Sequence, residues 1–122
     1  MDGEYRTVGI RCSITADENT PEAIDKATAE LLEKILQENS LLKENIISVI
    51  FTLTADLNTE FPAKTARLSF GCDDVPMLCA QEIPVPSALS MCIRVLIHAG
   101  SKNTKIKHVY LKGAKKLRPD LA

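Results

Sequence analysis

Alternating apolar and polar residues near the start of the chain predict a β-strand. The apolar members of the alternation are Val8, Ile10, Cys12 and Ile14. Successive side chains of a strand point to opposite faces, so Arg11, which lies between two of these residues, is expected on the face away from the core.

A long amphipathic helix is predicted from Pro21 to about Asn39. Thr20 can cap its first turn, Pro21 suits the first helical position, and Glu22 favours the positive end of the helix dipole. The apolar stripe of this helix consists of Ile24, Ala27, Leu31, Leu32, Ile35 and Leu36. Such a stripe packs against one side of a core.

Residues 46–54 are apolar and β-branched at almost every position, which predicts a central strand covered on both faces. A polar break at residues 56–60 separates this strand from a short helix, which begins at Phe61 and Pro62 and runs to about Ser69. Lys64 and Arg67 are three residues apart on that helix and share one of its faces, so two cations converge there.

Three more strands are predicted at residues 75–82, 91–99 and 106–111, and Pro84 and Pro86 confine the first connection to a loop. Residues 100–104 are expected to form a turn, and residues 113–122 a basic tail. The order is strand, helix, strand, helix and three strands. It predicts an α+β sheet whose helices cover one face and whose other face is buried by a partner, so we expect an oligomer.

Length and composition predict one soluble domain. The chain has 122 residues, of which 45% are hydrophobic and 25% charged. We expect residues 1–122 to form this single domain, with residues 1–7 as an N-terminal extension. No apolar run has the length of a membrane-spanning helix, and the first residues do not resemble a signal peptide. A cytoplasmic protein without membrane contact is therefore expected.

The net charge of −1 conceals an asymmetry between the halves of the chain. Residues 1–62 contain 12 acidic and 5 basic side chains, whereas residues 63–122 contain 4 acidic and 10 basic ones. A nucleic-acid-binding protein is usually basic throughout and carries aromatic residues that stack on bases. Since the chain has no Trp and only 4% aromatic residues, a small anionic ligand fits better than a nucleic acid.

The cysteines and histidines do not follow the spacing of a metal site. Four cysteines occur without a C-x-x-C pair, and His98 and His108 are too far apart for a zinc-ligand pair. Reduced thiols are expected in a chain without a secretory signal. Motifs of nucleophilic, metal-dependent or nucleotide chemistry are missing from the sequence, and Asp73–Asp74 fits a solvated turn better than a cation site.

Arg94 is the residue that the apolar pattern explains least. It lies inside the predicted strand 91–99, where a buried guanidinium costs several kcal/mol unless it meets an anion. Glu82, at the end of another apolar strand, is a candidate structural partner, which leaves a purely structural ion pair open as an alternative. Tyr110 belongs to the last strand and has an alternative interpretation as ordinary half-buried packing.

Five ordered blocks of residues form a recognisable series. They are Phe61-Pro62-Ala63-Lys64 with Arg67, Val75-Pro76 with Cys79 and Gln81-Glu82, Cys92-Ile93-Arg94-Val95, His108-Val109-Tyr110-Leu111, and Leu117-Arg118-Pro119-Asp120-Leu121. The series resembles the monofunctional chorismate mutases of the trimeric bacterial type, and the resemblance covers the chain from Val8 onward.

The resemblance implies a mixed five-stranded sheet with one long and one short helix, assembled from three copies into a pseudo-α/β barrel. It further implies a homotrimer with active sites at the subunit interfaces and the rearrangement of chorismate to prephenate in the synthesis of Phe and Tyr. No cofactor, metal or covalent intermediate is implied. Cations and hydrogen-bond donors would hold the substrate and stabilise charge on the ether oxygen of the transition state.

The resemblance also implies roles for individual residues. Arg94 would stabilise the ether oxygen and Glu82 would accept a hydrogen bond from the ring hydroxyl, as the two catalytic residues. The substrate-binding residues would be Arg11, Tyr110, Phe61, Ala63, Lys64, Arg67, Met77, Leu78, Cys79, Leu117 and Arg118. The tail, residues 113–122, would close the site. Because Cys79 and Glu82 are an odd number of residues apart, we expect Cys79 to contribute its backbone N–H rather than its thiol.

Three features depart from the family pattern, and two other classes of protein stay open. Leu78 replaces a usual hydroxyl residue, Lys112 stands where an acid is common, and the turn at residues 100–104 is about two residues shorter than is typical. The alternatives are a non-catalytic trimeric module that binds an anionic metabolite, or a small-molecule deaminase of similar assembly, because fold alone does not decide function. Turnover of chorismate, as opposed to mere stabilisation by it, separates these alternatives from a mutase.

Overall fold

A computed structural model describes residues 5–103 and 105–121 of the chain. Its elements, in which η marks a 3-10 helix, are β1 (Arg6–Thr15), α1 (Pro21–Glu38), η1 (Lys43–Asn45), β2 (Ile46–Leu53), α2 (Pro62–Phe70), β3 (Met77–Gln81), β4 (Cys92–Ser101), β5 (Val109–Leu111), η2 (Lys112–Leu117) and η3 (Pro119–Leu121). The prediction of five strands with one long and one short α-helix is confirmed.

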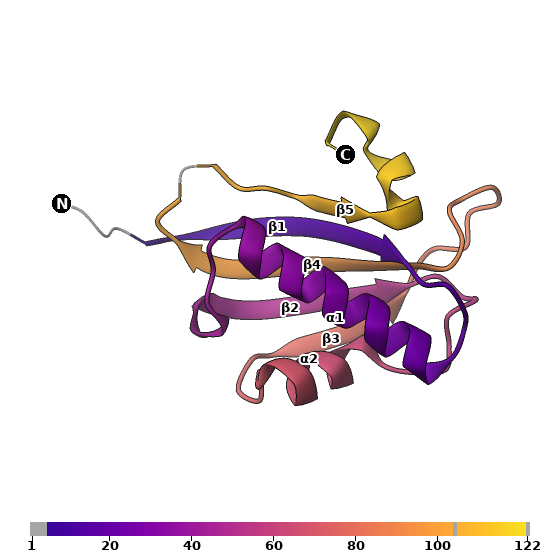
Figure 1. The fold of residues 1–122 in the computed structure, drawn as a ribbon, viewed down its shortest axis with the longest axis horizontal. Helices are drawn as coiled ribbons and strands as arrows, with labels where there is room; N and C mark the ends of the chain where they lie inside the picture. The colour runs from indigo at the N-terminus through magenta and orange to yellow at the C-terminus, as the bar shows by residue number, and fades with distance from the viewer. Residues whose placement is uncertain (1–4, 104, 122) are drawn as a thin grey trace.

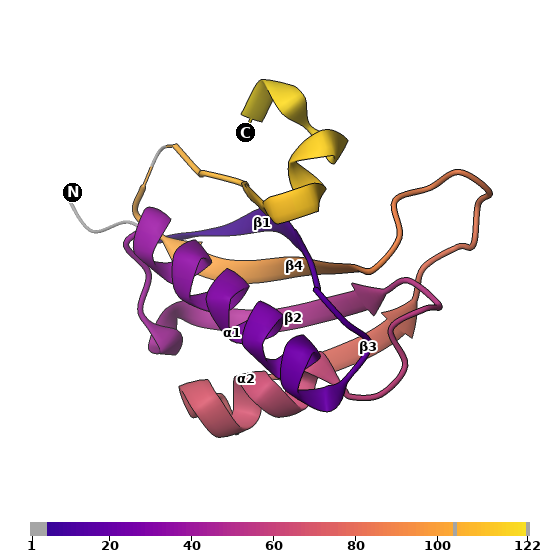
Figure 2. The same ribbon diagram turned by 45° about the vertical axis from the view of Figure 1, so that its right-hand side comes forward.

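The five strands form one mixed sheet in the order β3-β2-β4-β1-β5. β4 is antiparallel to both of its neighbours, whereas each edge strand is parallel to the strand beside it. Both α-helices lie against the same face of this sheet, with α1 crossing it diagonally (Figures 1 and 2). The predicted single helical layer is therefore confirmed.

The core lies between the sheet and the two helices. Ile10, Phe51 and Ile97 project from three adjacent strands and are 0% exposed, as are Leu31 and Ile35 of α1. Burying each such side chain stabilises the fold by roughly 1.5–3 kcal/mol before conformational entropy is counted. The alternation that predicted the first strand therefore arises from packing against α1.

Both ends of α1 are fixed by side chains. Thr20 Oγ1 accepts a hydrogen bond of 3.1 Å from the backbone N–H of Ala23, as the capping pattern predicted. After the last turn, the buried Asn39 side chain binds both backbone polar groups of Lys107, at 3.0 Å and 2.8 Å. The segment that leads into β5 is thereby tied to the end of the helix.

The side of the sheet opposite α1 and α2 is the open face. Its residues include Arg11, Ser13, Ile50, Thr52, Arg94, Leu96 and Tyr110. Ile47 is 47% exposed and Ile50 is 37% exposed, so the prediction that the second strand is covered on both faces is wrong within the described chain. The helices cover one face only, and the apolar side chains of β2 continue onto the other.

The ends of several strands differ from the prediction. β4 continues through Ser101, which pairs with Arg6, so the turn that we expected to begin at Gly100 starts later. β5 is limited to Val109–Leu111 and β3 to Met77–Gln81. The tail is folded into η2 and η3, with Ala114 buried and the N–H of Gly113 bonded to Thr15 Oγ1 at 3.0 Å. Within residues 5–103 and 105–121, no helix has the length and apolar character needed to span a membrane.

Candidate active site

The open face contains a pocket of about 430 Å³ over the middle of the sheet. It is lined by Arg11, Cys12, Ser13, Ile50, Thr52, Arg94, Val95, Leu96, Tyr110 and Leu117. Strand pairing produces this grouping, because Arg94 lies opposite Ser13 on one side and Thr52 on the other, while Ser13 lies opposite Tyr110. Four residues with a role implied by the sequence, Arg11, Arg94, Tyr110 and Leu117, are thus brought together.

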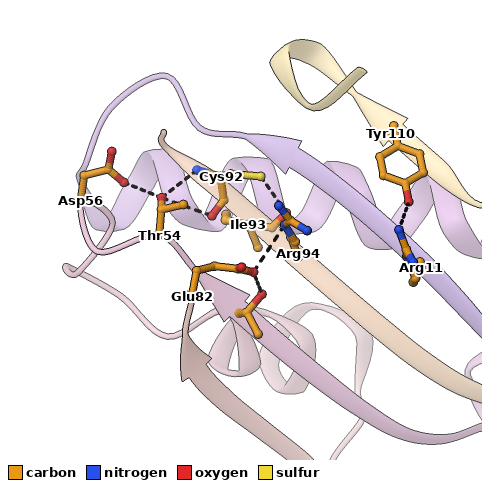
Figure 3. Close-up of polar contacts among 9 residues, drawn as sticks. Arg11, Thr54, Asp56, Glu82, Cys92, Ile93, Arg94 and Tyr110 are labelled. Carbon is orange, nitrogen blue, oxygen red and sulfur yellow. Dashed lines mark hydrogen bonds and ion pairs between the residues drawn. The ribbon is translucent and has the colours of Figure 1, made fainter. Parts of the chain in front are cut away.

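Arg94 and Glu82 form an ion pair at the edge of this pocket (Figure 3). Arg94 Nε lies 3.4 Å from Glu82 Oε2, and the two side chains are 43% and 22% exposed. The alternative in which Arg94 pairs with Glu82 is confirmed as a contact. Because Arg94 remains 43% exposed, the pairing does not remove it from the pocket, and the guanidinium is available to an anion.

Arg11 and Tyr110 form a second polar pair, on the neighbouring strands β1 and β5. Arg11 Nη2 donates a hydrogen bond of 3.2 Å to the Tyr110 hydroxyl (Figure 3). The backbone N–H of Arg11 donates to His108 Nδ1 at 3.0 Å, so the neutral ring carries its proton on Nε2. Tyr110 is 6% exposed, which means that packing holds the hydroxyl where Arg11 meets it.

The start of β4, two residues before Arg94, is held by a cluster of hydrogen bonds. Thr54 Oγ1 accepts from the N–H of Cys92 at 3.0 Å and donates to Asp56 at 2.5 Å. The Asp56 carboxylate also accepts from the N–H of Met91, a residue with φ of 54°. Burial raises the pKa of the Cys92 thiol to about 11, with Arg94 opposing the shift. This cluster fixes the strand from which Arg94 projects.

The tail approaches the same pocket from the end of β5. Leu117 lines the pocket, and the next residue, Arg118, binds Asp120 through Nε at 3.1 Å and Nη2 at 2.9 Å. The hydrogen bond to Asp120 raises the pKa of Arg118, and the same contact lowers the pKa of the Asp120 carboxyl. Both groups are exposed, so the pair contributes little stability.

The α2 residues with an implied role lie away from this pocket. Phe61 precedes the first turn of α2 and is 68% exposed. Lys64 forms an ion pair of 3.0 Å with Glu60, which raises the pKa of Lys64 and lowers that of Glu60. Ala63 is half-buried and Arg67 exposed on the same helix. The structure therefore separates these four residues from Arg11, Arg94 and Tyr110.

A second pocket, of about 380 Å³, lies beside the start of α2. It is lined by Leu53, Thr54, Ala55, Leu57, Asn58, Thr59, Glu60, Phe61, Cys79, Ala80 and Gln81. It thus joins Phe61 and Cys79, two residues with implied binding roles that are far apart in the sequence.

The side chains of β3 alternate between the two faces of the sheet. Cys79 pairs with the buried Phe51, and Met77 and Cys79 both pack against the core on the helix side. Leu78 pairs with Ile50 and is 69% exposed on the open face. The expected opposition of Cys79 and Glu82 follows this alternation, and Met77 directs its side chain to the core rather than to the open face.

Two residues of the polar arrangement had no assigned role from the sequence. Thr52 lines the pocket and donates a hydrogen bond to Glu82, and His108 accepts from the backbone of Arg11. Threonine is common in strands, so Thr52 carries no distinguishing signal in the sequence. The His108 contact depends on the path of the segment before β5, which a periodic pattern does not specify.

The arrangement is suited to binding a dianion. Two guanidinium groups and a phenol hydroxyl supply donors. Glu82 supplies an acceptor beside Arg94. Among residues 5–103 and 105–121, no cluster of three His, Cys, Asp or Glu side chains is arranged to hold a metal ion, and the four cysteines are unpaired.

Comparisons with known proteins agree on one family. Residues 7–121 match the family described as chorismate mutase type I. The sequence is 48% identical over 116 residues to chorismate mutase AroH of Thermus thermophilus, covering 93% of this chain and 94% of that protein. It is 40% identical over 116 residues to chorismate mutase AroH of Bacillus subtilis (strain 168), covering 93% and 91%. The solved chorismate mutase from Clostridium thermocellum superimposes with a TM-score of 0.83 at 42% identity, covering 89% of this chain and 98% of that one.

Proposed function

Because the chain belongs to the chorismate mutase type I family, it converts chorismate to prephenate, and we propose that the reaction takes place at Arg94 on the open face. The observation that carries this proposal is a half-exposed guanidinium, paired with Glu82, in the same pocket as Arg11 and Tyr110. As a chorismate mutase, the chain is an isomerase of aromatic amino-acid biosynthesis. We place it in the cytoplasm, where such a pathway enzyme is expected.

The chemistry assigns the largest role to Arg94. The rearrangement breaks one C–O bond and forms one C–C bond within a single molecule, so no group leaves and no external proton is required. Negative charge grows on the ether oxygen as the C–O bond breaks. A guanidinium aimed at that oxygen binds the transition state more strongly than the substrate, and only such differential binding accelerates the reaction.

The remaining pocket residues hold the reactive conformation. Arg11 and Tyr110 bind a carboxylate of the substrate, and Glu82 accepts a hydrogen bond from its ring hydroxyl. Holding both ends of a flexible dianion restricts the substrate to the reactive conformation before the bond breaks. Since none of these steps requires a cofactor or a metal, we propose that the protein uses neither.

The site is completed by a second copy of the chain in a homotrimer. Four residues with an implied binding role lie outside the Arg94 pocket of their own chain: Phe61, Ala63, Lys64 and Arg67. The second pocket, which contains Phe61 and Cys79, is also separate from the Arg94 pocket. Exposed apolar side chains on the open face, Ile50 and Leu78, supply surface for a contact between copies. We propose that the α2 pocket of one copy faces the Arg94 pocket of its neighbour.

The tail closes this site over bound substrate. Leu117 already lines the Arg94 pocket, and Arg118 follows it directly. In the structure Arg118 binds the Asp120 carboxylate. We propose that a substrate carboxylate takes the place of Asp120 when the site is occupied, since an exposed ion pair is weak enough to exchange.

Turnover of chorismate tests the activity directly. Purified protein, with a chelator present, is expected to accelerate the loss of the ultraviolet absorbance of chorismate and to form prephenate. A millionfold acceleration corresponds to lowering the barrier by about 8 kcal/mol. A protein that is merely stabilised against heat by chorismate, without turnover, would be a binding module instead.

Complementation between two variants tests the shared site. Arg94→Ala damages one pocket, and the double variant Lys64→Ala/Arg67→Ala damages the other. After the two chains are unfolded and refolded together, random mixing makes about a quarter of the sites whole in a cyclic oligomer in which each site joins two chains. Activity near that level supports the proposal, whereas the simple average of the two separate variants shows that each chain builds its own site.

A further inference from the structure

Thr52 is the polar residue of the open face closest to the Arg94–Glu82 pair without a role in the proposed function. It lies on β2 directly opposite Arg94 of β4, and its side chain is half-buried at the wall of the pocket. Its hydroxyl donates a hydrogen bond to Glu82 Oε2. That oxygen is the same one that faces Arg94 Nε at 3.4 Å, so a single carboxylate oxygen meets a hydroxyl and a guanidinium.

Glu82 needs such a contact because of its position in the chain. Its backbone N–H donates to Leu53 O at 2.8 Å, which is the last step of pairing with β2. The residues that follow, 83–91, contain neither helix nor strand, and Ile83 is 80% exposed. Glutamate has three side-chain torsions, and its terminal torsion is broad. The backbone alone therefore leaves the direction of the carboxylate open.

Thr52 supplies a stiff reference point for that carboxylate. A β-branched side chain in a strand is restricted at its first torsion, so the hydroxyl has few directions available. Thr52 is flanked on both sides by paired strands, β3 and β4. A hydrogen bond from a residue fixed in this way restricts the Glu82 side chain more than contact with the longer, half-exposed Arg94 can.

We propose that Thr52 is a positioning residue, which holds the Glu82 carboxylate in the direction that serves both Arg94 and the substrate. This inference rests on the proposed function, because that function makes Glu82 the acceptor for the ring hydroxyl of the substrate. Thr52 itself is assigned no contact with the reacting atoms. Thr52 acts through Glu82: it orients the acceptor, and through the shared oxygen it keeps the Arg94 guanidinium directed at the pocket.

Isosteric substitution tests this role. Thr52→Val keeps the shape of the side chain and removes the hydroxyl, and we expect kcat/KM for chorismate to fall about tenfold or more, in line with loss of one hydrogen bond to a charged group. Thr52→Ser keeps the hydroxyl and is expected to stay within about threefold of wild type. If Thr52→Val does not fold, Thr52→Ala is compared with Thr52→Ser in its place.

A double-mutant cycle with Glu82→Gln separates positioning from a general structural role. The loss in Thr52→Val should divide between kcat and KM as it does in Glu82→Gln, and adding Thr52→Val to Glu82→Gln should cost less than a further twofold. An equal loss in both backgrounds would overturn the proposal, and so would wild-type activity in Thr52→Val. Absence of chorismate turnover in the wild-type protein would instead refute the proposed function.

The chain offers a matched control outside the Arg94 pocket, on the buried side of α2. Thr65 Oγ1 donates to Asp25 at 2.6 Å, which links α2 to α1 by the same kind of hydroxyl–carboxylate bond. Thr65→Val should lower thermal stability and leave the partition between kcat and KM unchanged. If Thr65→Val reproduces the kinetic pattern of Thr52→Val, the effect comes from general loosening and the positioning role is wrong.

Discussion

The two faces of strand β4 differ in almost every physical respect although their residues alternate along one chain. Toward the helices, Ile93, Val95 and Ile97 are at most 2% exposed. Toward the open face, the Arg94 side chain is 43% exposed and lines the pocket. The first face is stabilised by packing, whereas the second presents a charged side chain at the pocket. Neighbouring residues of a single strand therefore alternate between the core and the candidate site.

The largest effect is expected on the helix face, from Phe51→Ala. Phe51 is 0% exposed at the centre of the core, and removing its ring should lower the free energy of unfolding by about 3–5 kcal/mol. Denaturation in urea measures the loss. Phe51→Leu, which keeps most of the volume, should lose much less. Equal losses for the two variants would mean that packing at this position is not what stabilises the sheet.

The next effect is expected on the open face, from Arg94→Ala. Losing one well-placed charged donor should lower kcat by about 10²–10³-fold, with the free energy of unfolding little changed. Arg94→Lys keeps the charge but not the planar fork and should recover only part of the rate. Near-normal turnover of Arg94→Ala would return Arg94 to a purely structural partner of Glu82.

Alkaline pH should weaken the folded state through a buried thiol. Burial raises the pKa of Cys12 from its ordinary value of 9.0 to about 12. The unfolded chain therefore loses this proton at lower pH than the folded chain does. The contribution of the protonated Cys12 thiol to the free energy of unfolding is fully present below pH 9. It is lost as pH rises toward 12, by up to about 1.4 kcal/mol per pH unit. Urea unfolding between pH 8 and pH 11 should show this slope, and Cys12→Ala should reduce it.

The smallest effect is expected from the histidines. A rearrangement without proton transfer requires no general acid or base, so His98→Asn and His108→Asn should keep kcat within a few-fold of wild type. His108 accepts a hydrogen bond from the Arg11 backbone, and its loss should appear mainly in KM. A loss of 10²-fold or more in kcat, with the fold intact, is typical of acid–base catalysis and would contradict the mechanism.

The sequence predicted most reliably what depends on periodicity. The alternation through Ile10 and Ile14 matches the observed strand β1, and the Thr20 cap matches the start of α1. The prediction for β2 failed because an apolar run has the same appearance whether its second face is covered by the same chain or left open. The extension of β4 to Ser101 was not predicted, because it depends on pairing with Arg6 rather than on local composition.

For the candidate site, the sequence indicated candidate residues but specified little about how they meet. Arg94 was distinguished by a charge in an apolar strand, and its contact with Glu82 was foreseen as one of two alternatives. Thr52 was not foreseen, because a threonine in a strand is ordinary until its hydroxyl is seen to meet a carboxylate. Contacts of this kind depend on strand order, which places β2 beside β4.

The alternation of core-facing and open-face residues along β4 also limits how such a protein can change in evolution. Deleting or inserting one residue between Cys92 and Ser101 would exchange the two faces, turning Arg94 toward the core and Ile93 toward solvent. Substitutions can accumulate in this strand, but changes of length cannot. The connections are under no such restriction, so descendants of a common ancestor should differ in length at residues 83–91 and 102–108 while β4 keeps a constant length. Comparing chain lengths across the family would show whether this limit has held.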